Sequence, residues 1–265
     1  MRKLFKETAV SLLKKAHIGA DPDFIIIGAQ KAGTTSLYNY LLQNPVVGKS
    51  LKKEIHYFDL NYTKGINWYR SHFVKKRIQK NISVIGEASP LYLYHPEAPN
   101  RVSENYPEIK LIVILRDPVE RVISHYKHLL RHKLIPEHLT LSDVIKIEKK
   151  RRKNISQSAY YDPVYSVLHR GEYLFQLNRW KELFSTDQIL ILQNDQLRKD
   201  PDNVLYRIEN FLKINHHTYS VDSKFNVSTK KLNSIDSSEI NNLNQYYEKY
   251  NQELLHSFNI KFNTH

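Results

Sequence analysis

The sequence contains no cysteine, a single methionine and only seven glycines among its 265 residues. The absence of cysteine excludes a disulfide framework, a thiolate metal site and a cysteine nucleophile. It also agrees with a reducing compartment, so we expect a cytoplasmic protein. No apolar run approaches the roughly 18 to 20 residues that a membrane-spanning helix requires. What remains is a globular protein whose few glycines are expected where the backbone needs their freedom.

The first 20 residues also lack the unbroken apolar stretch of a signal peptide, because Lys6 and Glu7 interrupt it. Their apolar and basic residues separate roughly onto two sides, which predicts an amphipathic helix over residues 1–20. Most amphipathic helices face their own core, so a packed first helix is the preferred interpretation. The alternative is a peripheral contact with an anionic membrane surface.

Basic residues outnumber acidic ones, 40 Lys and Arg against 27 Asp and Glu, and the formal net charge is +13. This charge favours an anionic partner and says nothing about the fold. We expect no nucleic-acid partner, and the 13 scattered histidines predict no metal site. Residues 132–160 are predicted to form a basic insertion on the substrate side, with an ordinary solvated surface as the alternative. The clustered basic residues there are Lys146, Lys149, Lys150, Arg151, Arg152 and Lys153.

Short apolar runs alternate with helical patterns along most of the chain. Strands are predicted at residues 24–27, 82–85, 109–115 and 189–192, and helices at 34–43, 118–131, 172–184 and 201–212. The second helix has a clear start, since Asp117 can cap it, Pro118 suits its first position and Glu120 completes a capping box. The alternation predicts a single α/β domain over residues 1–265, with a central, mostly parallel β-sheet flanked by helices. Residues 225–265 are predicted to form a loop and a final helix.

The segment DFIIIGAQKAGTTSLYNYLL, residues 23–42, has the chemistry of a phosphate-binding loop. A strand ends at Gly28, a tight loop follows, and a helix opens at Thr34, so backbone amides and the helix N-terminus form an anion site. The loop resembles a P-loop without being a Walker A motif, because Thr34 stands where that motif has its lysine, and the lysine is Lys31. A capped strand-to-helix turn alone would not require this lysine or three consecutive hydroxyls.

A second strand–turn–helix, residues 109–132, places Arg116 at the carboxyl end of a strand, where open α/β sheets bind ligands. Ser124 follows two turns into the helix. Taken singly, Arg116 could simply pair with Asp117 or Glu120, and Ser124 could be incidental. Two separated anion sites, however, suit a nucleotide phosphorylated at both its 5′ and 3′ ends.

These segments resemble the sulfotransferases that use 3′-phosphoadenosine 5′-phosphosulfate (PAPS), and especially their heparan sulfate branch. The resemblance covers residues 23–212 and adds KKEIHYFD, KGINWYRSHF, GEASPLYL, RGEYLFQLNRWKELF and QILILQNDQLRKDP to the two segments above. It implies that PAPS is the donor and PAP the product. It also implies that the 3′-phosphate is bound by Arg116 and Ser124, and that Lys230, in the late segment FNVSTKK, contacts the donor. The residues implied to cradle the 5′-phosphosulfate are Lys31, Ala32, Gly33, Thr34, Thr35 and Ser36.

Catalytic candidates come from KKEIHYFD, residues 52–59. If this segment is extended, Glu54 and His56 point to one face and Lys53 to the other. The resemblance makes Glu54 the general base, with His56 either assisting it or acting as the base itself, and Lys31 stabilising charge on the leaving group. Ala88 stands where the heparan branch usually has a lysine, which weakens heparan itself as the acceptor.

The resemblance therefore predicts an enzyme that moves a sulfuryl group from PAPS, by in-line transfer, to a hydroxyl or an amine of a carbohydrate acceptor. Tyr92, Tyr94 and His95 either shape the acceptor cleft or belong to the core. The alternative functions are a P-loop kinase of a small molecule and a non-catalytic module that binds a polyanion on the same fold.

Overall fold

The computed structural model describes residues 19–74, 81–155, 160–221 and 235–262. A central sheet of five strands has the order β2-β3-β1-β4-β5, and every neighbouring pair is parallel. The strands are β1 (Phe24–Gly28), β2 (Val47–Lys49), β3 (Val84–Ala88), β4 (Lys110–Leu115) and β5 (Ile189–Gln193). The α/β class and the parallel sheet predicted from the sequence are confirmed.

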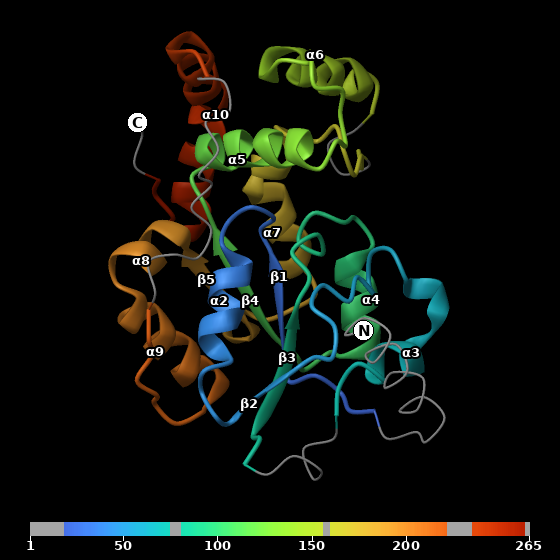
Figure 1. The fold of residues 1–265 in the computed structure, drawn as a ribbon, viewed down its shortest axis with the longest axis vertical. Helices are drawn as coiled ribbons and strands as arrows, with labels where there is room; N and C mark the ends of the chain where they lie inside the picture. The colour runs from blue at the N-terminus through green and yellow to red at the C-terminus, as the bar shows by residue number, and fades with distance from the viewer. Residues whose placement is uncertain (1–18, 75–80, 156–159, 222–234, 263–265) are drawn as a thin grey trace.

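Helices cover both faces of this sheet and its upper end (Figure 1). α2 lies over one face and α7 over the other, while α5, α6 and α10 lie beyond the carboxyl ends of the strands. The helices are α2 (Thr34–Leu41), α3 (Ile66–Arg70), α4 (Ala98–Asn105), α5 (Pro118–Arg131), α6 (Leu141–Arg152), α7 (Tyr173–Lys181), α8 (Asn194–Lys199), α9 (Pro201–Leu212) and α10 (Ser237–Phe258), with 3₁₀ turns at Tyr62–Lys64, His169–Gly171 and Thr186–Gln188.

The core lies around β1 and β4, whose apolar side chains are almost all inaccessible to solvent. Continuous apolar runs of this kind are typical of strands buried on both faces. Asp117 caps α5 as predicted, because its carboxylate accepts a hydrogen bond from the Glu120 amide at 2.9 Å, whereas the Glu120 carboxylate, predicted to complete a capping box, accepts from Arg116 Nε. α9 begins the same way, with the carboxylate of Asp200 accepting from the amide of Asn203. Local caps thus fix the starts of two helices that flank the sheet.

The predicted bounds of one strand are wrong, and one strand was missed. β3 begins at Val84, two residues after the predicted start, and continues to Ala88, three residues beyond the predicted end. The apolar pattern stops before Glu87, yet this carboxyl is fully buried in the strand because Tyr69, Ser89 and Tyr92 donate hydrogen bonds to it. The short edge strand β2 was not predicted at all.

Within the described residues, no helix has the length and apolar character that crossing a membrane would take. The predicted N-terminal helix lies outside the described residues, apart from its last two positions. The final helix is present as α10, and the loop predicted before it lies mostly outside the described residues.

Candidate active site

The loop between β1 and α2 is held at several points by neighbouring elements. The amide of Ala29 donates to the carbonyl of Ile114 at 2.7 Å, and the carbonyl of Ala32 accepts from Asn194 Nδ2 at 2.9 Å. Gly33 has a φ of +97°, and a Cβ atom there would lie 2.6 Å from Asn194 Nδ2. Glycine is therefore required at position 33 both for the turn and for the approach of α8.

The first turn of α2 offers amides and hydroxyls at the carboxyl end of the sheet. Gly33 occupies the N-cap position, so no side-chain cap covers the first amides of the helix. Thr35 and Ser36 are half-buried, while Thr34 is buried. Lys31 lies just before this turn, with a left-handed backbone at φ 71°. An uncapped helix N-terminus beside a lysine is well suited to bind an anion.

Lys53 also reaches this turn. Its Nζ donates a hydrogen bond of 2.5 Å to Thr35 Oγ1 and lies 3.4 Å from Glu54 Oε1. The prediction that Lys53 points away from the site is therefore wrong. The segment is not extended, because Glu54 and His56 each have a φ of 55°, so the side chains do not alternate as they would in a strand.

Side chains at the end of β3 hold this irregular segment in place. The amides of Ile55, His56 and Tyr57 donate to Glu87 Oε2, Ser89 Oγ and the Tyr92 hydroxyl, at 3.4, 3.1 and 2.7 Å. Backbone amides outside regular structure thereby find buried partners. The buried Glu87 thus has a structural role beneath the candidate site.

Glu54, His56 and Asp59 form a hydrogen-bonded chain. His56 Nε2 lies 3.3 Å from Glu54 Oε2, and His56 Nδ1 lies 2.7 Å from Asp59 Oδ2. The Asp59 side chain is fully buried, whereas the Glu54 side chain is 39% exposed. The predicted pair is therefore brought together, but Asp59 was not predicted. Its only signal in the sequence is its spacing of three residues from His56.

The charges of His56 and Glu54 follow from their hydrogen bonds. Burial of His56 opposes its charged form, but hydrogen bonds to Asp59 and Glu54 outweigh burial and raise the pKa of His56 to about 9. Burial also opposes ionisation of Glu54, but the hydrogen bond from His56 and the charge of Lys53 lower the pKa of Glu54 overall. At neutral pH the pair is therefore a carboxylate beside an imidazolium.

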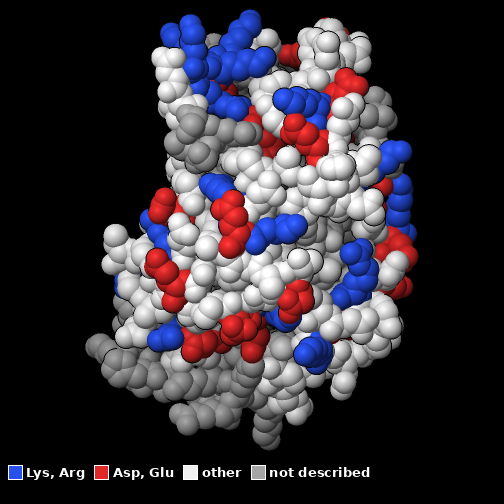
Figure 2. Space-filling model, turned by 180° about the vertical axis from the view of Figure 1, so that it is seen from behind, with Lys and Arg blue, Asp and Glu red and all other residues white. Residues whose placement is uncertain are grey.

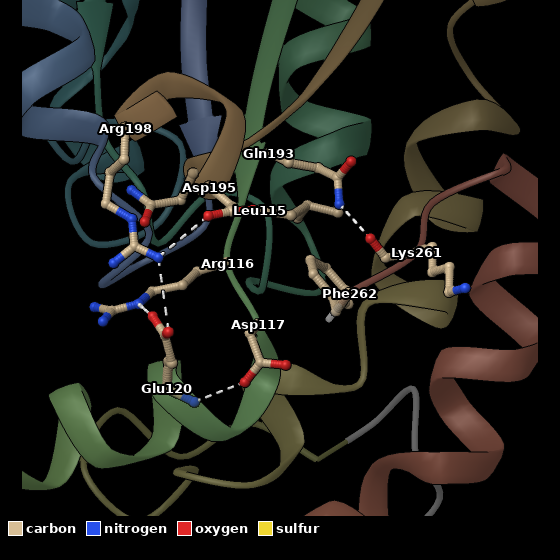
Figure 3. Close-up of a pocket in the computed structure, with 10 residues that line it drawn as sticks. Leu115, Arg116, Asp117, Glu120, Gln193, Asp195, Arg198, Lys261 and Phe262 are labelled. Carbon is tan, nitrogen blue, oxygen red and sulfur yellow. Dashed lines mark hydrogen bonds and ion pairs between the residues drawn. The ribbon is translucent and has the colours of Figure 1, made fainter. Parts of the chain in front are cut away.

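Arg116 stands between the loop and α5. Its Nε donates to Glu120 Oε2 at 2.8 Å, and its Nη1 to the carbonyl of Lys31 at 3.4 Å. Figure 3 shows Glu120 between Arg116 and Arg198, whose Nη2 lies 3.7 Å from Glu120 Oε1. The small pocket there, about 60 Å³, is also lined by Leu115 and Phe262. Ser124 follows Glu120 by four residues, so it lies on the same face of α5 as the carboxylate that pairs with Arg116.

The same face of α5 carries residues that the sequence reasoning did not single out. His128 and Arg131 follow Ser124 by about one and two turns, toward Lys31. Burial and the charges of Arg131 and Arg116 lower the pKa of Lys31. Burial and the charge of Lys31 lower the pKa of His128 to about 4, so this imidazole is neutral at pH 7. An anion beside Lys31 would relieve the mutual repulsion of these cations.

The basic cluster on α6 is divided between two environments. Arg152 is an internal residue, with Nη1 2.7 Å from Glu172 Oε1 and 3.3 Å from the Tyr246 hydroxyl. Arg151 pairs with Asp162 at 2.5 Å. The exposed residues of the cluster are Lys146, Lys149, Lys150, Arg151 and Lys153. Figure 2 shows the resulting basic patch at the end of the molecule formed by α6. The alternative of an ordinary solvated surface therefore does not describe Arg152.

The remaining predicted residues lie elsewhere. Tyr92, Tyr94 and His95 are buried, which favours the core interpretation over a place in an acceptor cleft. Ala88 is fully buried at the end of β3. Lys230 lies outside the described residues. No cluster of three or more histidine, aspartate or glutamate side chains with metal-binding geometry occurs in the described part of the chain.

Several known sulfotransferases are similar in sequence to this chain. The model of the sulfotransferase domain family matches residues 21–258. The membrane-associated sulfotransferase kil1 of Dictyostelium discoideum is 30% identical over 91% of this chain and 66% of its own length. Heparan sulfate glucosamine 3-O-sulfotransferase 3A1 of Mus musculus is 34% identical over 72% of this chain and 45% of its own length. The chain thus spans just under two thirds of the first relative and less than half of the second.

Solved structures share the fold. A sulfotransferase from Alicyclobacillus acidocaldarius superposes with a TM-score of 0.71 at 25% identity, covering 92% of this chain and 98% of that one. Mouse sulfotransferase SULT7A1, solved in complex with PAP, gives a TM-score of 0.55 at 14% identity, covering 96% and 91% of the two chains. The second likeness shows the fold alone.

Proposed function

The chain is a member of the sulfotransferase family, and we propose that it moves a sulfuryl group from PAPS to a hydroxyl or an amine of a carbohydrate acceptor. The observation that carries this proposal is the convergence of Lys31, Lys53 and Arg116 on the open N-terminus of α2, with Glu54 beside Lys53. Cations and helix amides lie on one side of this arrangement, and a carboxylate that can accept a proton lies close to them.

The residues present fit the proposed donor. The uncapped first turn of α2 and Lys31 would hold its 5′-phosphosulfate, and Arg116 with Ser124 would hold its 3′-phosphate. Burial, and after it the positive charges of Arg131 and Arg116, lower the pKa of Lys31, and an anion bound beside Lys31 would offset the repulsion from those two charges. When bound, PAPS would supply the sulfuryl group.

In-line transfer needs a base on the acceptor side and cations on the donor side. Glu54 is ionised and reachable from solvent, so it can take the proton from the attacking oxygen or nitrogen. His56 is protonated at neutral pH and has both ring nitrogens engaged, so we assign it to orienting Glu54. Lys53 ties Glu54 to Thr35, and Lys31 stabilises negative charge on the leaving side.

The acceptor class rests on the relatives and on the charge of this chain. One relative is a heparan sulfate glucosamine 3-O-sulfotransferase by name. α6, which carries the exposed lysines, lies beyond the carboxyl ends of the strands, where the phosphate loop follows β1 (Figure 1). Such a patch attracts a polyanion. We therefore propose an anionic glycan as the acceptor, with a portion of it resting on α6.

The test is transfer of radiolabelled sulfate from PAPS to a panel of oligosaccharides, lipids and phenols, with Glu54→Gln as the matched inactive control. We expect label on an anionic oligosaccharide, and PAP should raise the melting temperature without Mg²⁺. Stabilisation by ATP–Mg²⁺ and not by PAP would support a kinase instead. PAP binding without transfer to any acceptor would support a non-catalytic module.

A further inference from the structure

Arg170, in the 3₁₀ turn before α7, is a buried guanidinium directed at the phosphate loop. Its Nε donates to Ser166 Oγ at 2.8 Å, and its Nη2 donates to the carbonyls of Pro163 and Asp162 at 2.9 and 3.2 Å. The remaining amino group, Nη1, donates to Gln30 Oε1. The guanidinium also lies 4.9 Å from the centre of the Tyr94 ring. Only 3% of the residue is exposed.

The hydrogen-bond partners of Arg170 among the described residues are all neutral groups. A buried guanidinium without a bonded carboxylate is costly, and burial lowers the pKa of Arg170. Three of its four hydrogen bonds join it to Ser166, Pro163 and Asp162, which precede it in the chain. The fourth, with Gln30, is the one that reaches the phosphate loop.

Gln30 precedes Lys31, which has a left-handed backbone at φ 71°. This conformation is unfavourable for a residue other than glycine, so its neighbours must hold it. On the C-terminal side, Asn194 holds the carbonyl of Ala32 at 2.9 Å. On the N-terminal side, the side chain of Gln30 is held by Arg170. The direction of the Lys31 side chain depends on both.

We propose that Arg170 is a positioning residue for sulfuryl transfer, because it fixes the turn that aims Lys31 by holding the Gln30 side chain. This inference rests on the proposed function of Lys31. It also connects the substrate-side region to the donor loop, since Asp162, whose carbonyl Arg170 holds, pairs through its carboxylate with Arg151 of α6.

The test compares Gln30→Met, which keeps the length of the side chain and removes the acceptor, with Ser166→Ala, which removes a bond on the far side of the same guanidinium. Misplacing a catalytic group by about 1 Å can cost up to about 10²-fold in rate. We expect Gln30→Met to lower kcat per PAP-binding site about tenfold and to lower the melting temperature about as much as Ser166→Ala does, because each substitution removes one partner of the same buried guanidinium. Ser166→Ala should lower the melting temperature and leave kcat per site unchanged.

A readout that needs no turnover is the titration of the Lys31 amine in the free protein, followed by NMR after reductive ¹³C-methylation and assigned with Lys31→Arg. We expect Gln30→Met to move this titration toward the ordinary lysine value, and Ser166→Ala to leave it in place. Because Gln30 and Arg170 are proposed to act through one contact, the double variant Gln30→Met with Arg170→Lys should have a kcat no lower than that of Arg170→Lys alone.

The inference is overturned if Gln30→Met leaves both kcat and the Lys31 titration within error of the wild type, or if the two substitutions act additively. A wild-type protein that transfers nothing from PAPS would instead refute the proposed function. In that case the Lys31 titration alone still decides whether Arg170 and Gln30 position this side chain.

Discussion

His56 should carry a proton throughout the physiological pH range and lose it only near pH 9. Its imidazole lies between the carboxylates of Asp59 and Glu54, at 2.7 and 3.3 Å. The rise in pKa from 6.5 to about 9 corresponds to about 3 kcal/mol of extra interaction with the charged form, at 1.36 kcal/mol per unit. The His56 side chain is only 22% exposed, so solvent screens little of this interaction.

The sign of the effect on stability follows from this direction. A group whose pKa is raised by folding stabilises the fold fully below its unfolded pKa, here about 6.5, and loses that contribution as the pH rises through the folded pKa. The free energy of unfolding of the wild type should therefore fall by up to about 3 kcal/mol between pH 6.5 and pH 9.5, on this account. His56→Gln should lack this fall.

Two measurements check the expectation. Urea unfolding at closely spaced pH values gives the stability profile of each protein, and NMR follows the imidazole signal that His56→Gln removes. His128 serves as an internal contrast, because its pKa is lowered to about 4 and its signal should not titrate in this range. An imidazole of His56 that titrates at or below pH 6.5 would refute the charge assignment, as would identical stability profiles for the two proteins. An imidazole of His56 that is neutral at pH 7 would also be available to act as the base.

Three further outcomes are expected. Glu54→Gln should lower kcat by about 10² to 10⁴-fold while PAP binding is kept. Because the pKa of Glu54 is lowered, the acidic limb of the wild-type pH–rate profile should lie below the ordinary pKa of a glutamate. Near-full activity of Glu54→Gln together with an inactive His56→Ala would assign the role of base to His56. Lys31→Ala should mainly lower kcat, whereas Arg116→Ala should mainly raise the KM for PAPS, and intact kinetics in both would remove the donor assignment. Replacing three α6 lysines with alanine should raise the KM for an anionic glycan and weaken the dependence of that KM on salt. The KM for a neutral acceptor should not change. Equal effects from three lysines elsewhere would show that the α6 patch is an ordinary surface with no special role in acceptor binding. The α6 set is Lys146, Lys149 and Lys150, and the control set is Lys64, Lys181 and Lys213.

Much of the fold could be predicted because its signals are local. Runs of buried aliphatic residues mark β1 and β4, and the Asp-Pro pairs at 117–118 and 200–201 mark the starts of α5 and α9. The end of β3 could not be predicted, since a glutamate ordinarily ends a buried strand. Glu87 stays in the strand only because Tyr69 and Tyr92 donate to its carboxylate from distant parts of the chain.

The candidate site was predicted by residue type better than by geometry. The loop and its hydroxyls are where the sequence places them, because a strand, a glycine turn and a helix follow one another without interruption. The segment around Glu54 is different. Its two residues with positive φ are held by contacts with β3, so the assumption of an extended segment misplaced Lys53. Asp59 went unnoticed because its role depends on the orientation of His56.

The basic run on α6 shows why a count of charges cannot define a binding surface. Residues four apart share a helix face, and Glu148 and Arg152 lie on the inward one. Glu148 accepts hydrogen bonds from the amides of Leu168 and His169, and Arg152 meets Glu172. These contacts join α6 to the turn that carries Arg170. Replacing Arg152 together with the lysines would therefore remove the guanidinium that pairs with the buried Glu172 carboxylate, and a resulting loss of activity would report on the fold and not on acceptor binding. The lysine-only variant avoids this, because each side chain it removes is exposed.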